Sequence, residues 1–187
     1  MLEFITTHLT NGARPLAAAG AMRRLVRQQE GAAAVEFGLV AAPFLALVFA
    51  IMETAVIFFA GQALETAVAD SSRLIMTGQA QTQGMSAATF KNAVCAKIYG
   101  LFDCANGVFV DVQTFTSFNN MTLNNPVDAQ GNYQNLKYQP GVPGSIVVVR
   151  LFYQWPVYVS LLGLDMSNMN GGKRLLAATA AFRNEPY

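Results

Sequence analysis

The apolar residues of this 187-residue chain are concentrated in one run near its N-terminus. From Phe37 to Ala60 almost every residue is apolar, and only Glu53 and Thr54 interrupt the run. These 24 residues are long enough to cross a bilayer, whose hydrocarbon core needs about 20 apolar residues in a helix. Lipid offers the backbone no hydrogen-bond partner, so the segment must be helical. The pattern predicts one transmembrane helix.

Beyond Ala60 the pattern becomes that of an amphipathic helix. The apolar face carries Leu64, Val68 and Ile75, and the polar face carries Glu65, Asp70 and Arg73. Gly78 is a suitable helix stop, and residues 79–84 are expected to form a polar linker. A second helix is predicted from Ser86 to a point between Gly100 and Asp103. Its apolar positions at helical spacing are Phe90, Val94, Ile98 and Leu101.

The last part of the chain has the pattern of an antiparallel sheet. Residues 108–113 alternate between valine and other side chains, the period of a half-buried strand. Residues 146–155 are β-branched or aromatic almost throughout, and residues 175–182 form a weaker, alanine-rich third candidate that a helix would also suit. Helices followed by strands predict an α+β head with helices on one sheet face.

Two loops separate these strands. Residues 119–144 contain six asparagines and two Pro-Gly pairs, which are strong turn signals. So long a loop is either a face for a partner or a surface excursion. In the second loop, residues 163–172, Met169 falls where a calcium loop needs an oxygen ligand, so no calcium site is predicted.

Charge sets the expected topology. Charged residues make up 12% of the chain and apolar residues 53%, and the net charge is near neutral, which gives no basis for nucleic-acid binding. Four arginines precede the apolar run, at positions 14, 23, 24 and 27. This basic flank predicts a cytoplasmic N-terminus and an external C-terminal head.

Glu36 lies at the edge of the apolar run, where a carboxylate needs a partner. A cut after Gly31 would supply one, because the new amine of Ala32 would lie one helical turn from Glu36. In a packed array, the amine of a neighbouring subunit would serve equally well.

The residues around Gly31 and Glu36 resemble a known processing signal. A basic leader, Gly31, four small apolar residues, Glu36 and then Phe37 resemble the class III signal of type IV prepilins. The segments QQEGAAAVEF and SSRLIMTGQAQ, the paired cysteines and the ending AAFRNEPY are similar to TadE-like minor pseudopilins of the Tad/Flp tight-adherence pilus system.

The resemblance implies a chain processed by prepilin peptidase at Gly31–Ala32. Its parts would be a leader (1–31), a transmembrane and assembly helix (32–78) and a pilin-like periplasmic α+β head (79–187). It implies the bacterial inner membrane, with possible display at the pilus or cell surface, and a part in assembling or capping a pilus used in adhesion. The implied partners are prepilin peptidase, other Tad pseudopilins, the major Flp pilin and inner-membrane lipid.

Two further features bear on assembly. Cys95 and Cys104 both lie in the predicted external part, where an isolated pair most simply forms a disulfide, two free buried thiols being the alternative. Small residues recur every fourth position along the apolar helix, and they let helix backbones approach closely, although an alanine-rich helix also produces such runs by composition. This stripe comprises Ala34, Gly38, Ala42, Ala46 and Ala50.

The sequence gives little basis for an enzyme or a cofactor. The sole histidine, His8, falls in the expected leader, and no phosphate-binding glycine motif is present. Asp103 and Asp111 are expected as solvated residues at strand ends. Three alternatives stay open: an uncleaved bitopic periplasmic scaffold or receptor, a secretory signal cut near residues 61–63, and an enzyme with an unrecognised site, which a deep polar pocket in the head would favour. Translation begins at Met1 or Met22.

Overall fold

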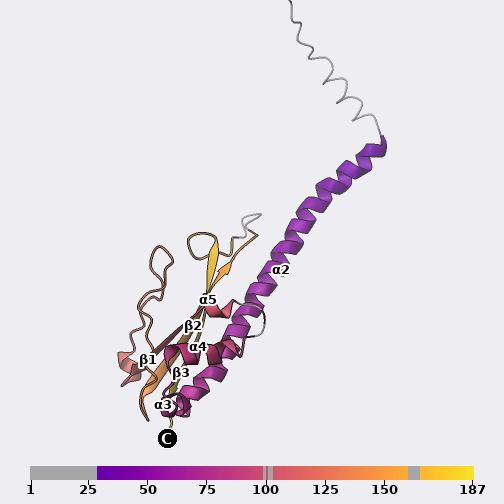
Figure 1. Cartoon of the computed structure of the whole chain (residues 1–187). Coiled ribbons are helices and arrows are strands. Elements are labelled where there is room, and N and C mark those ends of the chain that lie inside the picture. The colour runs from indigo at the N-terminus through magenta and orange to yellow at the C-terminus, as the bar shows by residue number, and fades with distance from the viewer. Residues whose placement is uncertain (1–28, 99, 101–102, 160–164) are drawn as a thin grey trace, which may run out of the picture. The chain divides into compact units, whose positions relative to one another are not determined.

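The computed structural model describes residues 29–98, 100, 103–159 and 165–187 (Figure 1). The predicted leader up to residue 28, with both candidate start sites, lies outside the described residues, as do Leu101 and Gly163. The chain divides into two compact units, Met1–Leu47 and Val48–Tyr187.

Helix α2, Gln29–Met76, contains the whole predicted transmembrane segment. It is long and apolar enough from Gly31 onward to cross a membrane, and it continues through Pro43. The predicted stop at Gly78 is confirmed, since this glycine adopts a left-handed φ of 77° directly after the helix. A β-carbon at this position would also overlap the ring of Tyr187, so glycine is required both for the backbone conformation and for the space.

The C-terminal tail closes the end of α2. The amide of Glu185 donates to the carbonyl of Met76 at 2.9 Å, which satisfies one of the carbonyls left free at a helix end. The side chain of Asn184 donates to the carbonyls of Pro140 and Val142 at 2.9 and 3.2 Å. The ending AAFRNEPY therefore fastens both the helix end and a distant turn.

The segment expected as a polar linker is partly helical. Residues Gln79–Thr82 form the one-turn helix α3, because Ala80 is buried and anchors the turn on the core. Helix α4, Ala87–Cys95, begins where predicted, with Ser86 as N-cap accepting from the amide of Thr89 at 3.2 Å.

Helix α4 ends earlier than the predicted 100–103. A separate short helix, α5 (Cys104–Gly107), follows, and the carboxylate of Asp103 accepts from the amide of Asn106 at 3.2 Å. Asp103 is thus an exposed helix cap rather than a strand-end residue.

The predicted antiparallel sheet is confirmed, with strand order β1–β2–β3. The strands are β1 (Val108–Phe115), β2 (Ile146–Pro156) and β3 (Lys173–Arg183). In the register, Val112 pairs with Val149, which pairs with Ala180 on β3. The alanine-rich third segment is therefore a strand, because eleven residues of β2 offer it a partner. The α+β class is confirmed.

One face of the sheet, here called the helix face, is packed against α2 and α4, as predicted (Figure 1). The buried residues at its centre come from two helices and three strands: Leu64, Val68 and Ile75 of α2, Phe90 and Val94 of α4, Val108 and Val112 of β1, Val149 and Leu151 of β2, and Ala178 of β3.

The opposite face, here called the loop face, is covered over β1 and β2 by the segment between these strands. Its residues Asp111, Val148 and Phe152 are buried, whereas Ala177 and Thr179 of β3 on the same face are exposed. The covering segment begins with the 3₁₀ turn η1 (Phe118–Asn120) and later reaches the edge of β1, where Tyr138 pairs with Val112 in a parallel bridge. The long loop is therefore a structural layer of the head.

The prediction for Asp111 was wrong. This residue is fully buried on the loop face, and Arg150 donates to its carboxylate at 2.9 and 2.7 Å. The side chain of Gln113 and the amide of Lys137 also donate to it, and Arg150 donates to the carbonyl of Asn124. The ion pair holds the loop to the sheet because each of its partners outside the strands is a backbone group of the loop.

Candidate functional site

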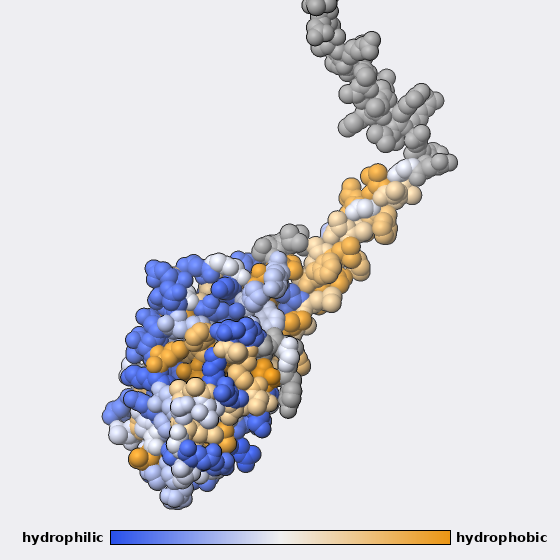
Figure 2. Space-filling model, in the orientation of Figure 1, coloured by the Kyte–Doolittle hydropathy of each residue, from blue (hydrophilic) through white to orange (hydrophobic). Residues whose placement is uncertain are grey.

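The upstream part of α2 exposes a continuous apolar surface (Figure 2). Phe37 is 75% exposed, Leu39 74% and Phe44 60%, although side chains of this kind are normally buried in a soluble fold. An exposed apolar surface of this extent marks a membrane or protein contact.

The predicted processing residues lie near the upstream end of the described part of α2. Gly31, Ala32, Glu36 and Phe37 are all exposed, and the Gly31–Ala32 bond lies within the described part of α2, Gln29–Met76. Among the described residues, the Glu36 carboxylate makes no hydrogen bond or ion pair. The role of these four residues stays a prediction.

The stripe of small residues is divided between two surroundings. Ala34, Gly38 and Ala42 are exposed, and a β-carbon added at Gly38 would meet no atom within 4 Å. Ala46 is half-buried, and Ala50 is buried. The upstream part of the stripe is free for another helix, so its packing role stays a prediction.

From Ala50 onward one side of α2 belongs to the head. Ala50, Ile57 and Ala60 are buried there, although they lie in the run predicted to cross the membrane. The predicted boundary at residues 78/79 stays untested, but the division between compact units falls at Leu47/Val48. Hydropathy alone could not separate the two surroundings, because lipid and a protein core both accept apolar side chains.

The partners of Glu53, a charged residue in the apolar part of α2, could not be predicted from the sequence. Its carboxylate accepts hydrogen bonds from two consecutive amides that follow β2, those of Tyr158 and Val159, the second at 2.9 Å. The available signal was a carboxylate inside an apolar run, but its partners are backbone groups 105 and 106 positions further along the chain.

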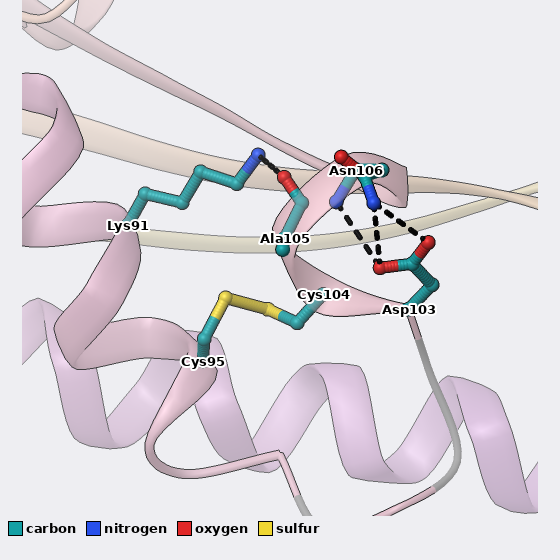
Figure 3. Close-up of a disulfide and its surroundings, with 6 residues drawn as sticks. All are labelled: Lys91, Cys95, Asp103, Cys104, Ala105 and Asn106. Atoms are coloured by element: carbon teal, nitrogen blue, oxygen red, sulfur yellow. Dashed lines mark hydrogen bonds between the residues drawn. A yellow bond between two sulfur atoms is a disulfide. The ribbon is translucent and has the colours of Figure 1, made fainter.

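The predicted disulfide is confirmed. Cys95 at the end of α4 is bonded to Cys104 at the start of α5, with 5.6 Å between their α-carbons (Figure 3). Beside the bond, the ammonium of Lys91 donates to the carbonyl of Ala105 at 2.7 Å. Together these contacts fix α5 and the start of β1 on α4.

The head also has an open polar cleft of about 420 Å³ between residues 125–131 and 167–170. The amide of Asn132 donates to Asp128 and lowers the pKa of that carboxyl, and the amide of Ser167 does the same for Asp165. Both carboxylates are engaged in shaping their own turns. The described residues contain no cluster of potential metal ligands.

The fold and the exposed helix define a class, that of proteins with one membrane-compatible helix continuing into a small α+β head. A family model described as TadE-like protein matches residues 31–73. This match confirms the resemblance over that segment, where the chain is similar to TadE-like proteins. The matched residues include both the exposed and the head-packed parts of α2. No curated protein and no solved structure was found to match.

Proposed function

We propose that the protein is a minor pseudopilin that takes part in assembling or capping a Tad/Flp-type pilus after cleavage by prepilin peptidase between Gly31 and Ala32. The observation that carries the proposal is the TadE-like match over residues 31–73, which starts at the glycine of the proposed cleavage bond. The exposure of Gly31 and Ala32 supports access by a peptidase.

Glu36 would then act through charge. Cleavage leaves an ammonium group on Ala32, four positions before Glu36 and on the same side of the helix. Its carboxylate has no partner among the described residues, and an unpaired charge at the edge of a bilayer is costly. The ammonium, from the same subunit or from a neighbour, neutralises it and favours one axial register between packed helices.

The exposed half of α2 would serve two partners in turn. Before assembly its apolar side chains suit the lipid of the inner membrane, with the arginine-rich leader in the cytoplasm and the head outside. During assembly the same surface suits the helices of other pilins, where small residues at Ala34, Gly38 and Ala42 permit close approach.

Processing is tested by Gly31→Ala, followed by N-terminal sequencing of material from the native membrane. The wild-type chain is expected to begin at Ala32, and the variant to keep its leader. Gly38→Ala is the matched control, because it adds the same methyl group to an open position of the same helix and should be processed normally. A wild-type chain that keeps its leader would instead support the uncleaved scaffold or receptor.

The charge mechanism is tested by Glu36→Gln. The variant is expected to be cleaved and folded, with piliation strongly reduced. Glu65→Gln, which changes an exposed glutamate further along α2, is the control and should pilate normally. Normal piliation with Glu36→Gln would contradict the mechanism.

A further inference from the structure

The contact between Glu53 and the amides of Tyr158 and Val159, here called the Glu53 clamp, fixes where one loop of the head lies along α2. The amide of Val157, one residue earlier, donates to the carbonyl of Gly172 at 2.9 Å. The 157–159 segment is therefore held from both sides, by the helix and by the turn that leads into β3.

The clamp places an exposed tyrosine at the level of Glu53, about one and a half turns of α2 before an exposed aromatic pair. Tyr158 is 82% exposed, and Phe58 and Phe59, just beyond Glu53 on α2, are 66% and 63% exposed. Of the exposed residues that follow on the helix, all but Ala69 are polar, beginning with Gln62 and Glu65. The aromatic side chains thus lie where the exposed surface changes from apolar to polar.

The spacing of residues along α2 gives the depth in the bilayer at which the exposed surface changes from apolar to polar. Glu36 and Glu53 are 17 residues apart, or about 25 Å at 1.5 Å per residue. If Glu36 lies at one edge of a hydrocarbon core about 30 Å thick, Glu53 lies close to the other edge. Phe58 and Phe59, about 8 Å further on, reach the headgroup region. The clamp places Tyr158 at the level of Glu53.

We propose that Tyr158, Phe58 and Phe59 form a lipid-interface seat, which docks the head on the outer headgroup boundary of a phospholipid bilayer. Tyrosine and other amphipathic aromatics favour this boundary, where a ring is buried and a hydroxyl stays hydrated. The clamp contributes twice: it gives the Glu53 carboxylate two donors at a depth where water is scarce, and it holds Tyr158 at the interface.

Lipid is the occupant that the surface favours, because every exposed residue of α2 from Phe37 to Phe59 is apolar, so the aromatic pair continues the apolar surface of the membrane helix. The inference rests on the membrane-spanning part of the proposed function. It does not depend on cleavage or on pilus assembly, and therefore the test uses the purified full-length chain.

The test reconstitutes the chain into phosphatidylcholine vesicles, with or without lipids brominated next to the headgroup, and measures tryptophan quenching. Trp155, the sole tryptophan, is kept in every variant, and wild-type quenching is the baseline. Tyr158→Trp is expected to show severalfold more additional quenching than Phe118→Trp. Phe118 is also exposed but follows the far end of β1.

Two further variants separate the possible failures. Phe44→Trp, on the exposed part of α2, is expected to be quenched by lipids brominated near the chain ends if the helix crosses the membrane. Absence of that quenching would overturn the membrane span itself, and the seat with it. Quenching of Phe44→Trp without quenching of Tyr158→Trp would overturn the seat alone.

The clamp is tested by Glu53→Ala in the Tyr158→Trp background. Additional quenching is expected to fall toward the Phe118→Trp level, with α2 still inserted. Unchanged quenching would remove the clamp from the proposal. If the tryptophan introduced at position 158 becomes shielded only when the ratio of protein to lipid is raised, a second copy of the chain covers the surface and the lipid seat is wrong.

Discussion

The two faces of the sheet are buried by different means. The helix face is covered by α2 and α4 through apolar side chains such as Leu64 and Phe90, which are fully buried. The loop face is covered by an irregular segment, and its centre is the ion pair between Asp111 and Arg150 rather than an apolar cluster. Both faces exclude water over β1 and β2.

The difference follows from the backbone of the covering layer. A helix satisfies its own amides and carbonyls, so it needs only an apolar side to cover a sheet. A loop brings free backbone groups, which must find partners when they are buried. Asp111 and Arg150 supply those partners to Lys137 and Asn124, which explains why a charged pair is found inside the head.

The largest expected loss of stability comes from a substitution on the loop face. Asp111→Ala leaves the Arg150 charge buried without its partner and should lower the free energy of unfolding by about 3–5 kcal/mol. Denaturant unfolding of the full chain in detergent, followed by Trp155 fluorescence, measures it. The double variant Asp111→Leu with Arg150→Met removes both charges and should lose less than the single variant. An equal or larger loss in the double variant would show that the charge left behind is not the cause.

The next largest loss of stability is expected from a substitution on the helix face. Leu64→Ala removes a fully buried side chain of α2 and should cost about 2–5 kcal/mol by the same measurement. Leu39→Ala makes the same change on the exposed part of the helix and should cost under about 0.5 kcal/mol in detergent. Similar losses for the two variants would contradict the division of α2 into an exposed part and a head-packed part.

The disulfide sharpens the comparison, because it fastens α4 of the helix face to the start of β1. Cys95→Ser with Cys104→Ser opens a short loop and should lower the free energy of unfolding by about 2–3 kcal/mol, since the unfolded chain gains freedom. Reduction of the wild-type chain should reproduce the loss. An unchanged denaturation midpoint on reduction would mean that hydrogen bonds such as the one from Lys91 hold α4 and the start of β1 together without the disulfide.

The smallest effect concerns Tyr133 of the loop face, whose ring stacks on Phe109 with 3.8 Å between centroids. Burial, with a lesser contribution from Tyr153, raises the pKa of Tyr133 from 10.0 to about 12. The stabilisation from this group is complete below pH 10 and is lost as the pH rises toward 12, because only the unfolded chain then releases the proton readily.

Tyr133→Phe should therefore lose less stability than the wild type over that alkaline range. Tyr158→Phe, which removes an exposed phenol, is the control and should follow the wild type. Parallel curves for Tyr133→Phe and the wild type would show that the phenol is not the titrating group. Unfolding curves recorded at stepped pH values make the comparison.

Features set by neighbours in the chain could be predicted. The apolar run gave α2, Ser86 gave the start of α4, Gly78 gave the end of α2, and alternation gave β1. The cysteine pair was predictable because the pattern pointed to an oxidising compartment. Features that depend on distant partners were missed, including the burial of Asp111, and so was the early end of α4.

The candidate site divides in the same way. The exposed apolar helix and the position of Glu36 follow from composition and spacing. The Glu53 clamp does not, because its partners are two backbone amides more than a hundred residues away, and backbone groups carry no sequence signature.

The sequence by itself determined that one segment suits a membrane, that helices precede strands, and where several of these elements begin and end. It could do so because hydrophobic period and capping act between residues a few positions apart. Only the tertiary structure decided which part of α2 meets the head, and which charges are buried. Those choices depend on burial, and burial depends on which surfaces meet once the chain has folded.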